Sequence, residues 1–342
     1  MSVPEVSIVV PVFNRPEALR YSLESVRRAR GKLAVEVILV DDGSQPPLDP
    51  QDPAIVAVGG RVIRQENRGL LFARLRGLEA VTGRYVLFLD SDDLVTADKL
   101  EAQVAAMERE QADVSYTDDA HAILKGGYDE LTIIPGAPQR DTTDIAYFFI
   151  TVQPAPHSPM FRREFLQGVV REPLFPPSPL YNPVAEIWFF HNAAPRPGRV
   201  VYVPGPRAIV GKHPGARLTD HWERLGVASL AVMEAFARTC PGDTEAGAHA
   251  RQLVGEKAFA SWRRLPRGMP ASFERRLVGV WRALAPGTSP GLGGNVFQSV
   301  ATMLGAERAG RLLRSMQNST YESCRTMTDS ELEQLLGTIP PP

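Results

Sequence analysis

Short apolar segments alternate with helical patterns along the first third of the chain. The segments that predict strands are residues 6–10, 35–40, 62–64, 85–89 and 114–117. Between them apolar residues recur at helical spacing, which predicts helices over residues 16–28, 70–80 and 97–110. This strand–helix–strand order predicts a mostly parallel sheet with helices on both faces. The strands are apolar rather than alternating, as expected when both faces are covered.

The remaining two thirds of the chain follow different patterns. Residues 126–215 are rich in proline and aromatic residues, so we expect only short regular structure there, in loops of the kind that carry specificity. From about residue 217 the pattern becomes helical. The predicted helices cover residues 225–238, 246–264, 272–284 and 296–316, with a linker over residues 287–294.

Composition and charge narrow the class of protein. The 342 residues suffice for one large domain or two ordinary ones, and the 44% hydrophobic and 23% charged residues are normal for a globular protein. A formal net charge of −1 gives no reason to expect nucleic-acid binding. Cys240 and Cys324 lie too far apart in sequence to suggest a disulfide framework or a zinc motif. No apolar run approaches the ~20 residues that span a bilayer, so we expect a soluble, cytoplasmic protein.

Carboxylates cluster where two of the predicted strands end. Asp90, Asp92 and Asp93 follow the strand at 85–89, and Asp41 and Asp42 end the strand at 35–40. Ligands of open α/β sheets bind at the carboxyl edge of the strands. Like charges this close together need a positive partner, and a divalent cation with oxygen ligands is the natural one. The clusters therefore predict a site for a metal-bound, phosphorylated ligand. The alternative, that the acids at 90–93 cap the next helix, requires only one acid.

Four motifs in register resemble those of the family 2 glycosyltransferases, which have the GT-A fold. They are residues 6–15 (VSIVVPVFNR), 40–44 (VDDGS), 67–69 with 73–74 (NRG and AR) and 90–93 (DSDD), with weaker similarity at 157–162 and 212–215. The resemblance implies an α/β, GT-A-type nucleotide-binding fold, in which a mostly parallel central sheet is flanked by helices. It implies a glycosyltransferase domain over residues 1–220, with a donor-binding half (1–120) and an acceptor-binding half (121–220). An α-helical region follows at 221–342.

The resemblance also implies a reaction. A sugar passes from a nucleotide-sugar, most often a UDP-sugar, to an acceptor hydroxyl on a glycan, a lipid-linked glycan or another molecule. The anomeric carbon is inverted, Mn²⁺ or Mg²⁺ assists, and the usual context is polysaccharide biosynthesis. Asp90-Ser91-Asp92 resembles the DxD motif: Asp92 ligates the metal, Asp90 faces the ribose or the donor sugar and contributes to the metal site, and Asp93 supports the cluster.

Other donor-site residues follow from the same resemblance. Asp41 or Asp42 accepts hydrogen bonds from the base or ribose, although the pair also fits a plain Asp-Gly turn. The segment containing Pro11, Phe13 and Asn14 lines the base pocket, or else it is a strand-to-helix connection with an asparagine cap.

Two arginines and a histidine complete the implied donor site. Arg68 and Arg74 contact the base or a phosphate. The family often has asparagine after the second arginine, where this chain has Leu75, which leaves a surface salt bridge open for Arg74. His213 lies near the metal or diphosphate, or is an ordinary surface histidine.

The acceptor side is matched less well. The family commonly supplies the catalytic base from a Glu-Asp pair that opens a late helix, and here only Glu186 is present. Glu186 is the candidate base, or a first-turn glutamate favoured by the helix dipole. Trp188 is a candidate wall for sugar stacking, and His157 is a candidate acceptor contact or a structural residue. Asp118-Asp119 lies outside the motif register, and we interpret it as a solvated turn.

Basic and aromatic residues alternate over residues 257–282, with seven Lys or Arg residues and four aromatic ones. This pattern fits either a surface that meets the inner face of a membrane and a lipid-linked acceptor, or amphipathic helices packed on the protein. Two other functions stay open. A sugar-nucleotide pyrophosphorylase usually has a glycine-rich loop after its first strand, and residues 11–16 contain no glycine. A noncatalytic nucleotide-sugar-binding scaffold would keep the donor residues and lack the base.

Overall fold

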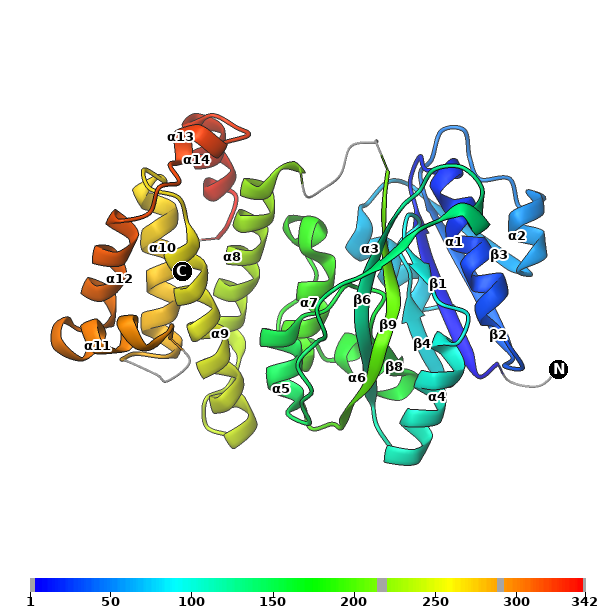
Figure 1. Ribbon diagram of the computed structural model, residues 1–342, viewed down its shortest axis with the longest axis horizontal. Helices are drawn as coiled ribbons and strands as arrows, with labels where there is room; N and C mark the ends of the chain where they lie inside the picture. Colours follow the sequence, from blue (N-terminus) through cyan, green and yellow to red (C-terminus); the bar gives the residue numbers. More distant parts are fainter. Residues whose placement is uncertain (1–3, 214–219, 288–291, 341–342) are drawn as a thin grey trace. The chain divides into compact units, whose positions relative to one another are not determined.

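The computed structural model describes residues 4–213, 220–287 and 292–340 (Figure 1). These residues form two compact units. The first, here called the sheet unit, comprises described residues up to 148 together with 152–173 and 197–213. The second, the helical unit, comprises 149–151, 174–196 and the described residues from 220 onward. Residues 174–196 group with the C-terminal helices, and the acceptor-binding half over residues 121–220 stays a prediction.

Nine strands of the described residues form one sheet in the order β3-β2-β1-β4-β8-β6-β9-β5, with β7 paired to β6. The strands are β1 (Val6–Val12), β2 (Val35–Asp42), β3 (Gly60–Gln65), β4 (Tyr85–Phe88), β5 (Leu94–Val95), β6 (Val114–Ile123), β7 (Ile133–Pro135), β8 (Met160–Arg162) and β9 (Val200–Lys212). Strands β3, β2, β1 and β4 are mutually parallel, as predicted. Beyond β4 the sheet is mixed: β8 is antiparallel to both β4 and β6, whereas β9 is parallel to β6.

Helices cover both faces of the parallel half. Those of the sheet unit are α1 (Pro16–Ala29), α2 (Pro53–Ala57), α3 (Leu70–Leu78), α4 (Lys99–Glu110), η1 (Tyr128–Glu130), α5 (Ile145–Tyr147) and α6 (Arg163–Arg171), and η2 (Phe148–Val152) lies where the two units divide. Leu19 and Leu23 of α1 join Ile8 and Val10 of β1 in the main core. On the opposite face α3 approaches closely, since a Cβ at Gly77 would lie 2.3 Å from Val9 Cγ1. This close packing fixes α3 against β1 and β2.

Strand β9 contradicts the expectation of only short structure between residues 126 and 215, because it extends over 13 residues. It contains Pro204 and Pro206, which lack the N–H that a regular ladder needs. The pairing of β9 with β6 shifts register on both sides of Asp118, and bulges of this kind accommodate residues that cannot join the ladder. The strand therefore continues past its prolines and ends beside the acidic loop after β4.

The helical unit contains η3 (Pro179–Val184), α7 (Ala185–Ala193), α8 (Trp222–Thr239), α9 (Glu245–Arg264), α10 (Ala271–Leu284), α11 (Asn295–Leu304), α12 (Ala306–Ser315), α13 (Tyr321–Cys324) and α14 (Asp329–Gly337) (Figure 1). The single helix predicted over 296–316 is in fact two, because Gly305 has φ of +82° and separates α11 from α12. Residues 288–291 of the predicted linker lie outside the described residues.

The aromatic residues interleaved with arginines over 257–282 belong to the core of the helical unit. Phe259, Trp262, Phe273 and Trp281 are all buried, with side chains from α9 and α10. Packing therefore accounts for these rings, as the second of the two interpretations predicted, and membrane contact stays a prediction. No helix in the described part of the chain is both long and apolar enough to cross a bilayer.

Candidate active site

The loops that follow β1, β2 and β4 meet at one edge of the sheet. Val12 at the end of β1 pairs with Asp41 of β2, and Asp42 pairs with Gln65 of β3. Because these strands are parallel, the acidic residues after β2 and β4 emerge on the same side. The acids at 90–93 do not cap α4, which begins at Lys99, so the capping alternative is wrong.

Asp92 contacts two groups that are distant in sequence. Its Oδ2 lies 3.0 Å from His213 Nε2 and accepts a charge-assisted hydrogen bond from Arg15 Nη1. The same Arg15 nitrogen lies 3.2 Å from His213 Nε2. The structure thus brings together Asp92 and His213, as the resemblance implied. Pro214 and Gly215, the residues that follow His213 in the matched segment 212–215, lie outside the described residues.

Arg15 is a site residue to which the sequence analysis assigned no role. It is the third residue after β1 and precedes Pro16, the first residue of α1. The only sequence signal for its position is that it leaves a parallel strand at the same edge as the acids. Its side chain is 29% exposed and that of Asp92 is 18% exposed, so the pair is partly shielded from water.

Asp90 faces a different partner. Its Oδ1 lies 2.7 Å from Arg74 Nη2 in an ion pair, and the Arg74 guanidinium lies 5.7 Å from the centre of the Phe88 ring. The Arg74 side chain is only 1% exposed. The surface salt bridge predicted for Arg74 is therefore wrong, because its ion pair is made by a buried side chain, and contact with a base or phosphate stays a prediction. Its ion pair with Asp90 holds that carboxylate in a fixed orientation.

Asp93 points into the protein and joins three elements. Its Oδ1 accepts a hydrogen bond of 3.0 Å from the backbone N–H of Gly211 in β9, and its carbonyl accepts one of 2.6 Å from Ser22 Oγ in α1. His157 Nδ1 lies 2.9 Å from Asp93 Oδ2, in contact but without hydrogen-bond geometry. Burial and the charges of Asp90 and Asp92 raise the pKa of Asp93, against the opposing effect of His157.

These contacts revise the role of His157. Its side chain is fully buried beneath the acidic loop, which leaves no surface for an acceptor. The prediction of an acceptor contact is therefore replaced by its structural alternative. Ser91, between the two outer acids of the motif, is buried as well.

Gly211 allows β9 to pass the acidic loop. A Cβ built there would lie 1.9 Å from the Asp92 carbonyl oxygen and 2.9 Å from Leu124 Cδ1. Real Cβ atoms do not approach other atoms so closely, so only glycine fits. The close approach sets the end of β9, and with it His213 two residues later, against Asp92.

Asp92 and His213 could supply two ligands to a divalent cation, but not a complete set. No group of three or more His, Cys, Asp or Glu residues among the described residues is arranged to bind a metal alone. Two donors 3.0 Å apart match neighbouring positions in an octahedron with bonds of roughly 2.1 Å. Such an ion takes its other ligands from water and substrate phosphates. The donor set would therefore suit Mg²⁺ or Mn²⁺ with its remaining ligands supplied from outside the protein.

The two acids after β2 build the neighbouring loops. Asp41 accepts hydrogen bonds from the backbone N–H groups of Ser44 and Leu48 and pairs with Arg64. Burial would raise the pKa of Asp41, but the hydrogen bonds from Ser44, Leu48 and Arg64 outweigh that effect and lower it. Asp42 accepts bonds of 2.9 Å and 2.8 Å from the N–H groups of Arg68 and Gly69. Both carboxylates thus shape the loops at this edge, and direct contact with a base or ribose stays a prediction.

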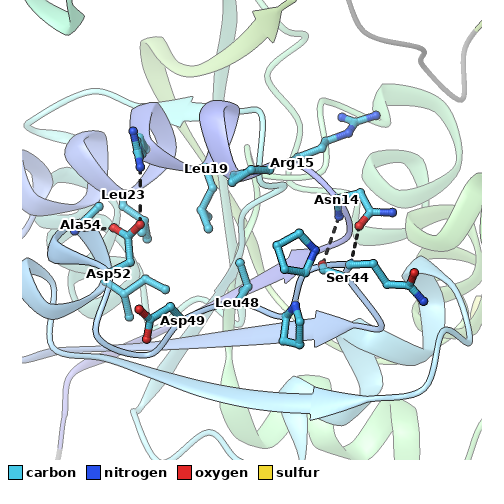
Figure 2. Close-up of a pocket in the computed structure, with 15 residues that line it drawn as sticks. Asn14, Arg15, Leu19, Leu23, Ser44, Leu48, Asp49, Asp52 and Ala54 are labelled. Atoms are coloured by element: carbon cyan, nitrogen blue, oxygen red, sulfur yellow. Dashed lines mark hydrogen bonds and ion pairs between the residues drawn. The ribbon is translucent and has the colours of Figure 1, made fainter.

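The segment after β1 is tied to the loop after β2. Asn14 has φ of +52°, its N–H donates to Ser44 Oγ, and its Oδ1 accepts a bond of 2.8 Å from Gln45 N (Figure 2). The asparagine therefore does not cap α1. Of the other two residues predicted to line the base pocket, Pro11 is buried and Phe13 is 46% exposed. Arg68 is exposed and stacks on the Phe72 ring at 4.5 Å.

A pocket of about 250 Å³ lies beside this loop (Figure 2). Its walls come from α1, α2 and the loop between β2 and α2, and Leu19, Leu23 and Leu48 supply apolar surface. Asn14 and Arg15 also line it, so it adjoins the acidic edge on the side of α1.

Polar residues are buried in the sheet behind the site. Lys99 is fully buried and donates a bond of 2.9 Å to the Ser158 carbonyl, and burial lowers the pKa of Lys99 to about 7. The prediction of a solvated turn at Asp118-Asp119 is wrong. Asp118 lies in β6, is 7% exposed and accepts hydrogen bonds from Tyr202 Oη and the N–H of Gly205. Asp118 therefore stabilises the bulge in β9.

The two remaining predicted residues lie in the helical unit. Glu186 is in the first turn of α7 and is half-buried. Trp188 is fully buried, with its ring edge-on to Phe189 and its Nε1 donating 3.3 Å to the Phe175 carbonyl. A buried ring presents no face for a sugar, so the stacking role predicted for Trp188 is not supported by its position.

Residues 7–169 match the model of "Glycosyl transferase family 2". This part of the chain is a family 2 glycosyltransferase domain. The match covers β1 to β8 and includes the acids of the candidate site.

Solved structures show the same fold over a longer range. The structure of S. aureus TarS 1-349 in complex with UDP-GlcNAc has a TM-score of 0.62 and 17% identity, over 95% of this chain and 93% of that chain.

Two bacterial relatives match the family 2 domain in sequence. EpsH of Bacillus subtilis (strain 168) is 38% identical over 103 residues, which are 30% of this chain and 30% of EpsH. The succinoglycan biosynthesis protein ExoO of Rhizobium meliloti (strain 1021) is 34% identical over 106 residues, which are 30% of this chain and 29% of ExoO. The matched segments thus span less than a third of each relative. The family 2 domain also includes His157, and β9 with His213 lies outside it.

Proposed function

We propose that this chain transfers a sugar from a nucleoside diphosphate sugar to an acceptor hydroxyl, with assistance from Mg²⁺ or Mn²⁺. The convergence of Asp92 and His213, 3.0 Å apart at the carboxyl edge of the sheet, is the observation that carries this proposal. UDP is the nucleotide we favour, because TarS, which has the same fold, has been solved in complex with UDP-GlcNAc. The relation to a succinoglycan biosynthesis protein favours a polysaccharide or related glycan as the acceptor.

The residues of the site have separate roles in this proposal. Asp92 and His213 would hold the divalent cation, which when bound neutralises charge on the departing diphosphate. Arg74 and the interior contacts of Asp93 keep the acidic loop in place, so little reorganisation is needed as charge develops. Asp90, oriented by Arg74, faces the ribose or donor sugar.

The chemical step we propose is a single displacement at the anomeric carbon. The acceptor oxygen forms a bond to that carbon as its bond to the diphosphate oxygen breaks, and the configuration inverts. The acceptor proton passes to a carboxylate, for which Glu186 is our candidate. The bond-breaking transition state has oxocarbenium character, as in glycoside hydrolysis.

Thermal shift measurements with a panel of nucleotide-sugars, each with and without Mn²⁺, test the proposal. We expect one UDP-sugar to raise the melting temperature only when Mn²⁺ is present, and Asp92→Asn to abolish that shift and nearly abolish transfer. Glu164→Gln, a change in α6 outside the site, is the control and should keep both. Normal metal-dependent binding by the Asp92→Asn variant would contradict the assignment. Binding without hydrolysis or transfer to any acceptor would favour a noncatalytic scaffold instead.

A further inference from the structure

Arg15 stands where a cation bound by both Asp92 and His213 would be expected. Its Nη1 contacts Asp92 Oδ2 and lies 3.2 Å from His213 Nε2, while these two ligand atoms are 3.0 Å apart. The three atoms form a small triangle. A divalent cation about 2.1 Å from both ligand atoms would lie within contact distance of the same guanidinium nitrogen. A cation on the side of the guanidinium would overlap it, and one on the far side would still lie within roughly 4 Å, where two positive charges repel each other.

The position of Arg15 also gives it freedom to leave. Its side chain is 29% exposed, whereas the Arg74 side chain beside Asp90 is 1% exposed. An arginine at a partly exposed position can turn toward solvent without unpacking a core. Arg15 is also the N-cap residue of α1 and makes no side-chain cap bond there. Moving the guanidinium therefore does not require α1 to unwind.

We propose that Arg15 is an internal counter-ion that holds Asp92 and His213 together in the donor-free protein and is displaced by the divalent cation. The proposal rests on the proposed use of a divalent cation in the reaction. Its consequence is that free metal binds weakly to the donor-free protein. A metal ion that arrives with a diphosphate brings additional ligands and overcomes the competition. The site is thereby kept assembled without retaining a metal between turnovers.

Arg15 then differs from the buried arginine of the same edge. Arg74 is itself buried and forms an ion pair with Asp90, so truncating it would leave a void in the packed interior beside that carboxylate. Removal of Arg15 leaves Asp92 partly exposed to water and open to metal. Removing Arg74 should therefore disrupt the site, whereas removing Arg15 should raise the affinity of the donor-free protein for metal.

Mn²⁺ titration of the donor-free protein, followed by the EPR signal of free Mn²⁺, tests the proposal without any turnover. We expect Arg15→Gln to bind Mn²⁺ about two- to fivefold more tightly than the wild type, the scale of one lost partly exposed ion pair. Arg20→Gln is the matched control. Arg20 lies in α1, which Arg15 precedes, and pairs with Asp52 at 3.7 Å rather than with Asp92. The Mn²⁺ affinity of the Arg20→Gln variant should therefore equal that of the wild type. Asp92→Asn in the Arg15→Gln background should remove the gain.

The possible results separate this inference from the proposed function. Equal or weaker Mn²⁺ binding by Arg15→Gln, in a variant with wild-type circular dichroism and melting temperature, overturns the role of Arg15. A gain that persists in the Arg15→Gln/Asp92→Asn double variant also overturns it, because the added metal would then bind elsewhere. UDP and UDP-sugar binding are measured in parallel by calorimetry with saturating Mn²⁺. If neither the wild type nor any variant binds UDP or the UDP-sugar, the proposed function fails. The comparison of Mn²⁺ affinities still decides the role of Arg15 in that case.

Discussion

Gly211 is the position where a single methyl group should damage the site most directly. In Gly211→Ala the new Cβ would lie 1.9 Å from the Asp92 carbonyl oxygen and 3.1 Å from its carbonyl carbon. Relief to the shortest tolerable separation, 3.0 Å, requires a relative movement of about 1 Å between β9 and the acidic loop. The shortest of these contacts is to a backbone atom of that loop, so a rotation of the Leu124 side chain, 2.9 Å away, cannot absorb the movement.

Two costs follow from this displacement. Overpacking of a well-packed interior costs roughly 1–3 kcal/mol. The buried hydrogen bond from Gly211 N to Asp93 Oδ1, 3.0 Å long, weakens at the same time, which adds on the order of 1–2 kcal/mol for a charged acceptor. We expect a loss of roughly 2–5 kcal/mol in the free energy of unfolding. For a unit of this size that is about 5–15 °C in melting temperature.

The functional loss should exceed the loss of stability. His213 follows Gly211 by two residues, so the same displacement separates His213 from Asp92. A misplacement of about 1 Å at a reacting centre can cost 10²-fold in rate. Calorimetry gives the melting temperature, and metal-dependent UDP-sugar hydrolysis at a temperature where the variant is folded gives the rate.

A second glycine provides the control. A Cβ at Gly168, in α6 of the same unit, meets nothing within 4 Å. Gly168→Ala should therefore stabilise the protein by about 0.5–1 kcal/mol through helix propensity and leave hydrolysis unchanged. A Gly211→Ala variant with wild-type melting temperature and wild-type metal-dependent binding would refute the argument that β9 is held against the acidic loop by this close approach.

Three further predictions concern titratable groups. Glu186→Gln should keep UDP affinity and reduce transfer by about 10²-fold or more, and an equal loss of UDP affinity in binding assays would contradict the role of base. Burial lowers the pKa of His191 to about 4. The unfolded chain then binds a proton that the folded protein excludes between about pH 4 and 6.5, so stability falls as pH drops below 6.5, by about 2 kcal/mol at pH 5. Urea titrations should show this loss in the wild type and a smaller one in His191→Gln. Burial lowers the pKa of Lys99 to about 7, so unfolded lysine binds the extra proton above that pH and stability should rise by about 2 kcal/mol from pH 7 to 9. The same pH slope in Lys99→Met would show that Lys99 is not its source.

The parallel half of the fold and its acidic edge could be predicted from local sequence patterns. Strands β1, β2 and β4 are short apolar runs whose ends are marked by Asn14, Asp41 and Asp90. Parallel pairing brings such ends together whatever the rest of the chain does. The helices of the C-terminal third were predictable for a similar reason, since apolar spacing reports a buried face. The break at Gly305 was missed because spacing alone does not show a positive φ.

The contacts that complete the site were decided only by tertiary structure. Arg15 and His213 lie 198 residues apart in sequence and meet at Asp92. Their meeting depends on β9 continuing past two prolines, on bulges that Asp118 stabilises, and on the space left by Gly211. The buried positions of Arg74, His157 and Trp188 were equally hidden, because residue type records what a side chain can do and not whether water or a ligand reaches it. Local pattern thus determined which strands end in acids, and long-range packing determined which charges those acids face.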